Sequence, residues 1–272
     1  KIETGAINSI RECIGCNICV TGDMTITPIR CTQNPTMGEE WRKGWHPENI
    51  PVKKSEKRIL VVGAGPAGLE ATRALGQRGY EVMLAEASEH LGGRVLKESA
   101  LPGLSEWRRV RDWRVGQIEP MANVSVFRGN ELTAEDVLAI GADAVVLATG
   151  ATWLRNGVGR NSSEAFFGAD NLQVFSPDDI MNGIYPDAGP VLLYDDDGFY
   201  LASVLAGVVV QRGHQVQYVT PEDVIAGWTS NTLDYRHIQK RLRKLGVHFH
   251  TSKSLQSFDG QHAKIACGYS DQ

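Results

Sequence analysis

A short apolar run followed at once by closely spaced glycines constrains the fold of this chain most strongly. Residues 58–62, Arg-Ile-Leu-Val-Val, lack polar alternation, which is typical of a strand buried on both faces. The turn Gly-Ala-Gly-Pro-Ala-Gly over residues 63–68 follows directly, and small apolar residues then recur at helical spacing. A second apolar strand over residues 81–85 ends in Glu86. Strand, glycine turn, helix, strand and acid in this order predict a dinucleotide-binding βαβ unit.

The glycines of this turn have separate roles in holding a nucleotide. Gly63 permits the tight turn, Gly65 lets the main chain approach a pyrophosphate, and Gly68 lets the helix pack closely on the strand. Pro66 and Ala67 stand at the start of the helix, whose amino terminus attracts phosphate charge. We therefore expect the pyrophosphate of a nucleotide at this turn.

Charged side chains complete the predicted nucleotide site. Glu86 is placed to accept hydrogen bonds from ribose hydroxyls, and its charge would repel a 2′-phosphate. A second glycine turn ends in Gly93 and Arg94, so it could also approach the phosphates with Arg94 as a charged donor. The alternative for this second turn is a plain surface turn with a solvated arginine. A further buried strand over residues 144–148 is expected to close the nucleotide-binding layer.

Four cysteines near the start of the chain, Cys13, Cys16, Cys19 and Cys31, indicate a metal centre. Three thiolates at two-residue spacing, with a fourth from a returning loop, can surround a four-iron, four-sulfur cluster, which takes four Cys ligands. Gly15 lets the loop curl tightly and brings N–H groups near sulfide. Structural zinc and disulfides are the alternatives. No secretory stretch precedes the cysteines, so we expect a reducing, cytoplasmic compartment.

The segment that carries these cysteines has few features of regular structure. Residues 1–46 are rich in Gly, Pro, Thr and Asn and keep no helical period. We expect an irregular segment whose folding depends on cluster ligation. Trp41 and Trp45 are either apolar covers of the cluster or ordinary packing residues. Residues 47–57 predict a polar linker.

A second βαβ pattern begins after Pro190 with an apolar strand over residues 191–194. Its turn carries Asp195, Asp196 and Asp197 where phosphate-binding glycines would be expected. Negative charge at low dielectric repels pyrophosphate, so we expect no second nicotinamide nucleotide here. Three adjacent aspartates cannot all face one metal ion, which favours a solvated acidic turn over a metal site.

The remaining sequence gives weaker signals. It predicts a helix over residues 231–245, a strand over 247–250 and a hairpin toward residue 265. His248 and His250 share one strand face, but no third metal ligand is indicated nearby. No Ser, His and Asp grouping or nucleophile elbow is recognisable. We assign no catalytic residue and expect no self-sufficient catalytic centre.

Composition and length fit a globular protein with more than one core. The chain has 272 residues, 42% of them hydrophobic, and a net charge of −4, with no apolar run that could span a bilayer. We expect neither a nucleic-acid nor a membrane partner. The predicted class is α/β, an irregular Cys-rich segment followed by two Rossmann-like three-layer domains. The predicted parts are residues 1–57 (cluster segment and linker), 58–187 (first nucleotide domain with a connector) and 188–272 (an incomplete, degenerate second nucleotide fold).

Four stretches of the chain resemble the trimethylamine, dimethylamine and histamine dehydrogenases. The resemblance covers essentially the whole chain and is most specific over residues 1–110. The four stretches are C-I-G-C-N-I-C-V, C-T-Q-N-P-T-M-G-E-E-W-R-K-G-W-H-P-E, V-V-G-A-G-P-A-G-L-E-A and A-L-P-G-L-S-E-W.

This resemblance implies the electron-transfer portion of an iron–sulfur flavoprotein that oxidises amines. Members of the family are similar in having a TIM barrel that holds FMN covalently, a 4Fe-4S cluster ligated by cysteines, and two nucleotide folds. The resemblance implies that an electron-transfer protein, such as electron-transfer flavoprotein, removes the electrons singly, and that the full enzyme is a homodimer. It also implies that ADP is bound structurally in place of a working FAD. The residues implied to surround ADP are Gly63, Gly65, Pro66, Ala67, Gly68, Glu86, Ala87, Gly93, Arg94, Val95 and Glu106.

The chain also departs from the family pattern. No barrel precedes Lys1, and the sequence stops near Cys267, before the closing strands and helix that the resemblance implies. We expect a fragment of a longer polypeptide, the alternative being a second chain that supplies the FMN barrel. The amine that is oxidised is determined in that barrel.

Two other functions stay open at this point. An enoate-reductase-like oxidoreductase would use FAD to pass electrons from NAD(P)H to the cluster, and it would need a glycine turn where Asp195 to Asp197 stand. A non-redox binding module would hold both zinc and ADP structurally.

Overall fold

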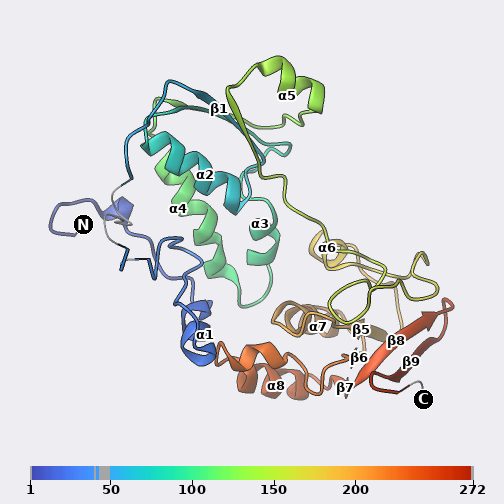
Figure 1. Cartoon of the computed structure of the whole chain (residues 1–272). Helices are drawn as coiled ribbons and strands as arrows, with labels where there is room; N and C mark the ends of the chain where they lie inside the picture. The colour runs from blue at the N-terminus through green and yellow to red at the C-terminus, as the bar shows by residue number, and fades with distance from the viewer. Residues whose placement is uncertain (1, 40, 43–49, 271–272) are drawn as a thin grey trace. The chain divides into compact units, whose positions relative to one another are not determined.

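The computed structural model describes residues 2–39, 41, 42 and 50–270, and the chain divides into two compact units (Figure 1). The units are Lys1–Ala151 and Thr152–Gln272, and each contains its own parallel sheet. The predicted α/β class with parallel sheets is therefore confirmed. Residues 152–187, which the sequence attaches as a connector to the first nucleotide domain, group with the second unit. The finer three-part division stays a prediction.

The first unit is built on a parallel sheet with strand order β3-β2-β1-β4. Its middle strand β1 pairs on both sides, with Ile59 opposite Val82 in β2 and opposite Ala144 in β4. Leu60 and Val61 of β1 are fully buried, as the continuous apolar run predicts. The carboxyl ends of all four strands lie at one edge, where the glycine turn follows β1. The strands are β1 (Arg58–Val62), β2 (Glu81–Ala85), β3 (Val124–Phe127) and β4 (Ala144–Leu147).

Helices α2 and α4 pack on one face of this sheet. Leu69 of α2 and Val115 of α4 join Val61 and Leu84 in one buried cluster. On β4, Val145 and Leu147 are 40% and 74% exposed. Within the described residues of this unit, helices therefore cover one face of the sheet, whereas the predicted three-layer fold would have both faces covered. The helices of the unit are α2 (Pro66–Gln77), α3 (Arg94–Ser99), η2 (Ser105–Arg108), α4 (Arg109–Ile118) and α5 (Ala134–Ile140).

The Cys-rich segment is more ordered than its composition predicts. It contains the short 3-10 helix η1 (Ile7–Ser9) and the helix α1 (Ile18–Thr25), which carries Cys19. Helix α1 is flanked at both ends by residues in the left-handed conformation, Asn17 with φ 54° and Ile26 with φ 55°. Because these residues end the helix after eight residues, the sequence shows no extended helical periodicity. Trp41 is 77% exposed, so neither packing role predicted for it is seen, and Trp45 lies outside the described residues.

One apolar contact fixes the cysteine loop to the first unit. Ile14, between Cys13 and Gly15, is 5% exposed and is buried with Val95 of α3 and Val110 of α4. Burial of such a side chain stabilises the contact by roughly 1.5–3 kcal/mol. The loop is therefore packed on α3 and α4, although its composition is polar.

The second unit repeats the strand–turn–helix plan on a smaller parallel sheet of order β5-β6-β7. Val209 of α7 and Leu242 of α8 pack on Tyr218 of β6. The predicted helix over 231–245 begins four residues late, because Leu233 adopts φ 65° and interrupts it. The elements are α6 (Pro177–Met181), β5 (Val191–Tyr194), α7 (Leu201–Gln211), β6 (Val216–Val219), η3 (Gly227–Ser230), α8 (Tyr235–Lys244), β7 (His248–His250) and the hairpin β8 (Lys253–Phe258) and β9 (Ala263–Cys267).

Strand β5 stands at the edge of the described sheet, whereas β1 is central in its own. All four residues of β5 are only half-buried. A cavity of about 890 Å³ borders this strand and is lined mainly by apolar side chains, among them Leu192, Leu205 and Phe258. Across the described chain, no helix combines the length and the apolar character that crossing a bilayer requires.

Candidate nucleotide site and cysteine loop

Two positions in the first glycine turn have no room for a side chain. Gly63 has φ +96°, and a Cβ there would lie 2.4 Å from the carbonyl oxygen of Ala148. A Cβ on Gly68 would lie 1.8 Å from the carbonyl oxygen of Gly63. Helix α2 therefore packs directly on the turn, as the third glycine of the pattern predicts.

The space beside Gly65 is open, in contrast with its neighbours. A Cβ on Gly65 would meet no atom within 4 Å, and a Cβ on Gly93 would lie 3.1 Å from the Cα of Gly65. The N–H of Gly92 donates to the carbonyl oxygen of Ala64 at 2.8 Å. The structure thus brings the two glycine turns together and leaves main chain accessible between them, which is the condition for close approach of a pyrophosphate at a helix amino terminus.

Glu86 connects the glycine turn to the loop after β2. Its Oε2 accepts the N–H of Ala64 at 2.7 Å, and its Oε1 accepts the N–H and the hydroxyl of Ser88, both at 2.9 Å. An ionised carboxylate has about four acceptor positions, so this side chain keeps capacity for ribose hydroxyls. Glu86 stands where the spacing predicts, at the end of β2 and against the turn.

The other predicted nucleotide residues lie in varied surroundings. Pro66, Ala67 and Ala87 are exposed, and the guanidinium of Arg94 donates to the carbonyl oxygen of Ala151. Two further side chains make contacts outside the glycine turns. Val95 packs with Ile14 and Val110, and Glu106 on η2 forms an ion pair with Arg109 at 2.6 Å. Their roles toward ADP stay predictions.

The four cysteines of the first segment are all free thiols. Gly15 has φ +68°, and its N–H donates to the Sγ of Cys13 at 3.3 Å. The Sγ of Cys16 lies 3.2 Å from the hydroxyl of Thr32. Hydrogen bonds of this kind to ligand sulfurs tune an iron–sulfur cluster.

The cysteine loop has the donor atoms of a metal centre but does not gather them in this structure. Among the described residues, no three His, Cys, Asp or Glu side chains are gathered to hold a metal ion. The donor set itself fits a four-iron cluster, because it offers four free thiols, a tightly curled glycine and an N–H directed at a sulfur. Ligation by Cys13, Cys16, Cys19 and Cys31 stays a prediction.

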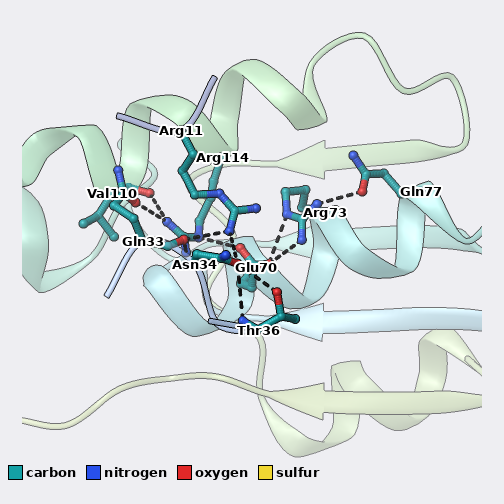
Figure 2. A network of polar contacts seen from close by, with 9 residues as sticks. All are labelled: Arg11, Gln33, Asn34, Thr36, Glu70, Arg73, Gln77, Val110 and Arg114. Atoms are coloured by element: carbon teal, nitrogen blue, oxygen red, sulfur yellow. Dashed lines mark hydrogen bonds and ion pairs between the residues drawn. The ribbon is translucent and has the colours of Figure 1, made fainter. Parts of the chain in front are cut away.

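A network of charged side chains behind the cysteine loop was missed by the sequence reasoning (Figure 2). Arg114 of α4 is 3% exposed, and its Nε lies 2.8 Å from the Oε2 of Glu70 in α2. Arg73 of α2 is 7% exposed and donates to the Oε1 of Glu70. Burial would raise the pKa of Glu70, but the hydrogen bond from Arg73 and the charges of Arg73, Arg114 and Arg11 outweigh it and lower that pKa. Glu70 is therefore ionised in the fold.

An aromatic ring adds to this network. The guanidinium carbons of Arg11 and Arg73 lie 4.0 Å and 5.3 Å from the ring centroid of Trp113. Each is within the range of a cation–π interaction. Arg11 comes from the cysteine segment, so the ring joins that segment to the helices of the first unit.

The acidic turn of the second unit is only partly the solvated turn that the sequence predicts, because Asp197 is exposed and Asp196 is half-buried, whereas Asp195 is buried. Asp195 is 2% exposed, and its Oδ2 accepts the hydroxyl of Tyr218 at 2.7 Å. Its Oδ1 accepts the N–H groups of Asp197 at 3.1 Å and Gly198 at 3.0 Å. Burial raises the pKa of Asp195, although these three donors counter it. Burial and the neighbouring Asp195 also raise the pKa of Tyr218 well above its usual value. Two N–H groups of the turn are thus bonded to a carboxyl group of the chain itself.

The two histidines of β7 do not form a metal pair. The Nε2 of His250 is 2.7 Å from the Oε1 of Gln217 on β6, and the other histidine, His248, is exposed.

Comparison with known proteins gives close relatives over the full extent of the chain. The family model of the pyridine nucleotide-disulphide oxidoreductases matches residues 57–176. Dimethylamine dehydrogenase of Hyphomicrobium sp. (strain x) is 38% identical over 255 residues, which are 91% of this chain and 34% of that protein. The structure of histamine dehydrogenase from Rhizobium sp. 4-9 matches 100% of this chain and 42% of its own, with 48% identity and a TM-score of 0.96.

A third relative is named for a different amine. The structure of 6-hydroxypseudooxynicotine amine oxidase from Pseudomonas geniculata N1 matches 99% of this chain and 40% of its own, with 44% identity and a TM-score of 0.95. The chain thus spans well under half the length of each of these three relatives.

Proposed function

Because the chain belongs to the family of histamine dehydrogenase and dimethylamine dehydrogenase, we propose that it is the electron-transfer portion of an amine dehydrogenase. The three relatives described above are oxidoreductases whose names refer to amines. In this proposal the CH–NH group of an amine is oxidised at FMN on a barrel domain, and the present residues carry electrons away from it. Which amine is oxidised is left open by the residues of this chain.

The observation that carries the proposal is the loop of four free cysteines packed on the nucleotide unit. Cys13, Cys16, Cys19 and Cys31 would hold a four-iron, four-sulfur cluster. When bound, such a cluster supplies a centre that accepts and releases single electrons. The chain's own part is to anchor the loop through Ile14 and to direct the N–H of Gly15 at a ligand sulfur.

The first unit would retain ADP as a structural ligand. The open main chain beside Gly65 would take the pyrophosphate, and Glu86 would accept the ribose hydroxyls. The second unit supports the static role, because the carboxylate of Asp195 already bonds the N–H groups of its turn. The N–H groups of Asp197 and Gly198 are therefore not available to the phosphates of a nicotinamide donor, and the acidic side chains would repel them.

Two partners complete the proposed function. The FMN barrel would be the electron donor, either in the same polypeptide or in a second chain, and a protein such as electron-transfer flavoprotein would be the acceptor. The full enzyme would be a homodimer in the cytoplasm. These proposals rest on the family resemblance.

The test is a cofactor analysis of the anaerobically prepared full-length protein. We expect iron and acid-labile sulfide in equal amounts, and ADP released on denaturation. Cys31→Ser should lower the iron content, whereas the matched control Cys267→Ser, which changes the fifth free cysteine, should leave it unchanged. Addition of NADH or NADPH should not bleach the visible absorbance.

Each rival function has its own signature in the same analysis. Recovery of FAD with bleaching by NADH would identify the NAD(P)H-dependent oxidoreductase instead. Zinc in place of iron, with no dithionite-sensitive absorbance, would identify the non-redox binding module. Either result overturns the proposal.

A further inference from the structure

A buried arginine holds the loop that carries Cys31. The Nη1 of Arg114 donates to the side-chain oxygen of Gln33 at 3.0 Å, and its Nη2 donates to the main-chain oxygen of the same residue at 3.2 Å (Figure 2). Gln33 is 2% exposed and lies two residues after Cys31. Because both groups are removed from water, this paired contact fixes the loop in one position relative to α4.

Gln33 also reaches the other end of the cysteine loop. Its Nε2 donates to the main-chain oxygen of Glu12 at 3.0 Å, and Glu12 directly precedes Cys13. Arg11 closes the connection from the opposite direction, since its Nη1 donates to the main-chain oxygen of Gln33 at 2.9 Å and to the Oδ1 of Asn34 at 3.0 Å. The buried side-chain amide of Gln33 therefore joins the segment before Cys13 to the segment after Cys31.

The charges in this network do not balance among themselves. The residues drawn in Figure 2 include three guanidinium groups, those of Arg11, Arg73 and Arg114, and the single carboxylate of Glu70. Burial lowers the pKa of Arg114, and the negative charges of Glu70 and of Cys31 counter that effect. Arg114 is thus connected to the Cys31 loop both through Gln33 and through its charge. Two of these guanidinium groups, those of Arg11 and Arg114, are hydrogen-bonded to Gln33 in the segment that carries the cysteines.

A cluster with four thiolate ligands carries net negative charge, and one-electron reduction makes that charge more negative. A fixed positive charge nearby stabilises the reduced form more than the oxidised form, and net charge is one of the levers on a cluster's reduction potential. A buried guanidinium acts more strongly than an exposed one, because water and salt screen it less. Arg114 meets both conditions, being buried and hydrogen-bonded to the ligand loop.

We propose that Arg114 is a positioning residue of the electron-transfer centre, which holds the Cys31 loop through Gln33 and raises the reduction potential of the cluster by its buried positive charge. This proposal rests on the cluster of the proposed function. It assigns Glu70 the opposite effect on the potential, because its carboxylate is 2.8 Å from Arg114 and offsets part of that charge.

The experiment is a redox titration of the full-length protein, followed by the electron paramagnetic resonance signal of the reduced cluster. At a fixed solution potential, Arg114→Gln should lower the ratio of reduced to oxidised cluster by about tenfold, which is 59 mV for a one-electron couple. Glu70→Gln should raise that ratio. Arg114→Lys keeps the positive charge but not the paired contact with Gln33. Its ratio of reduced to oxidised cluster should therefore stay within about threefold of that of the unmodified protein.

Because Arg114→Gln and Glu70→Gln should shift the reduction potential in opposite directions, the pair distinguishes an effect of charge from damage to the fold. Arg58→Gln is the control, because it removes an exposed guanidinium of the same unit, and it should leave the ratio unchanged. If Arg114→Gln fails to fold, Glu70→Gln and Arg114→Lys still decide the question. Equal potentials in all loaded variants, or shifts of the same sign in Arg114→Gln and Glu70→Gln, would overturn the inference while iron and sulfide remain present. Absence of iron and sulfide in the unmodified protein would overturn the proposed function itself, and this inference with it.

Discussion

In the first unit, the turn after β1 leaves main chain open beside Gly65, whereas in the second unit the turn after β5 is occupied by the chain's own Asp195. Both turns join a parallel strand to a helix. The first has glycines at the positions of close approach, and the second directs a carboxylate at the N–H groups of Asp197 and Gly198. The comparison shows that the same strand–turn–helix topology can bind the phosphate of a ligand or a carboxylate of the chain itself. A few side chains in the turn decide between the two.

The largest effect is expected where the first turn leaves no space. Gly68→Ala places a Cβ 1.8 Å from the carbonyl oxygen of Gly63, and the main chain there cannot yield. We expect a loss of more than about 3 kcal/mol in the free energy of unfolding, together with loss of bound nucleotide. Chemical denaturation and nucleotide content measure the two effects.

Gly65→Ala is the matched control in the same turn. Its Cβ would meet no atom within 4 Å, so the free energy of unfolding without nucleotide should change little. Nucleotide retention should still fall, because the methyl group occupies the space in which the pyrophosphate is proposed to lie. Full retention in Gly65→Ala would contradict the placement of the ligand at this turn.

The next effect concerns the acid of the first unit. Glu86→Ala removes the acceptor of the Ala64 and Ser88 N–H groups and of the proposed ribose contacts. We expect a loss of about 1.5–3 kcal/mol in nucleotide binding, as for hydrogen bonds to a charged group. Calorimetric titration with ADP measures it. Unchanged affinity would mean that Glu86 only supports the turn.

Asp195, the acid of the second unit, should affect the stability of the fold and not the binding of nucleotide. Burial raises the pKa of Asp195, so the folded state binds a proton there more tightly than the unfolded state does. Its contribution to stability is full below the ordinary Asp range and is lost as the pH rises through the raised pKa. The Asn side chain of Asp195→Asn does not titrate, so the stability of this variant relative to the unmodified protein should increase as the pH rises above the ordinary Asp range.

Denaturant titrations at several pH values test this expectation. A stability difference between Asp195→Asn and the unmodified protein that stays constant with pH would show that the pKa of Asp195 is the same in the folded and unfolded states. Nucleotide content should be unchanged in this variant, which separates the second turn from the first.

The smallest effect compares the capping boxes of the two units. Thr133 caps α5 and Ser176 caps α6, and each hydroxyl accepts the N–H of the third helical residue at 3.2 Å. Thr133→Ala and Ser176→Ala should each cost about 1 kcal/mol of unfolding free energy, the usual value for a lost cap. Thermal unfolding measures both. The cost should be larger for Ser176, which is 7% exposed, because its neighbours lose a buried partner.

Local signals in the sequence were enough for the strands and turns that build the first site. The bounds of β1, β2 and β5 follow from apolar runs ended by glycine, proline or acid, and these signals need no tertiary context. The positions of Gly63, Gly68 and Glu86 follow from spacing alone, because the βαβ geometry fixes them.

The missed features depend on partners that are distant in sequence. Helix α4 was not predicted, because its run Arg-Val-Arg-Asp-Trp-Arg shows no apolar stripe, and Arg114 is buried only through Glu70 and Gln33. The burial of Asp195 was missed for the same reason, since its donor Tyr218 comes 23 residues later. Polar groups that pair across a fold resemble solvated groups when only their neighbours in sequence are considered.

The free side of β5 has a practical consequence for handling this protein. In the described sheet β5 pairs with β6 alone, and its side chains Val191, Leu192 and Leu193 are half-buried beside an apolar cavity. An unprotected strand of this kind offers a template to any other extended chain. A polypeptide cut down to these residues is expected to self-associate as its concentration rises, and Leu192→Lys should delay the onset of aggregation.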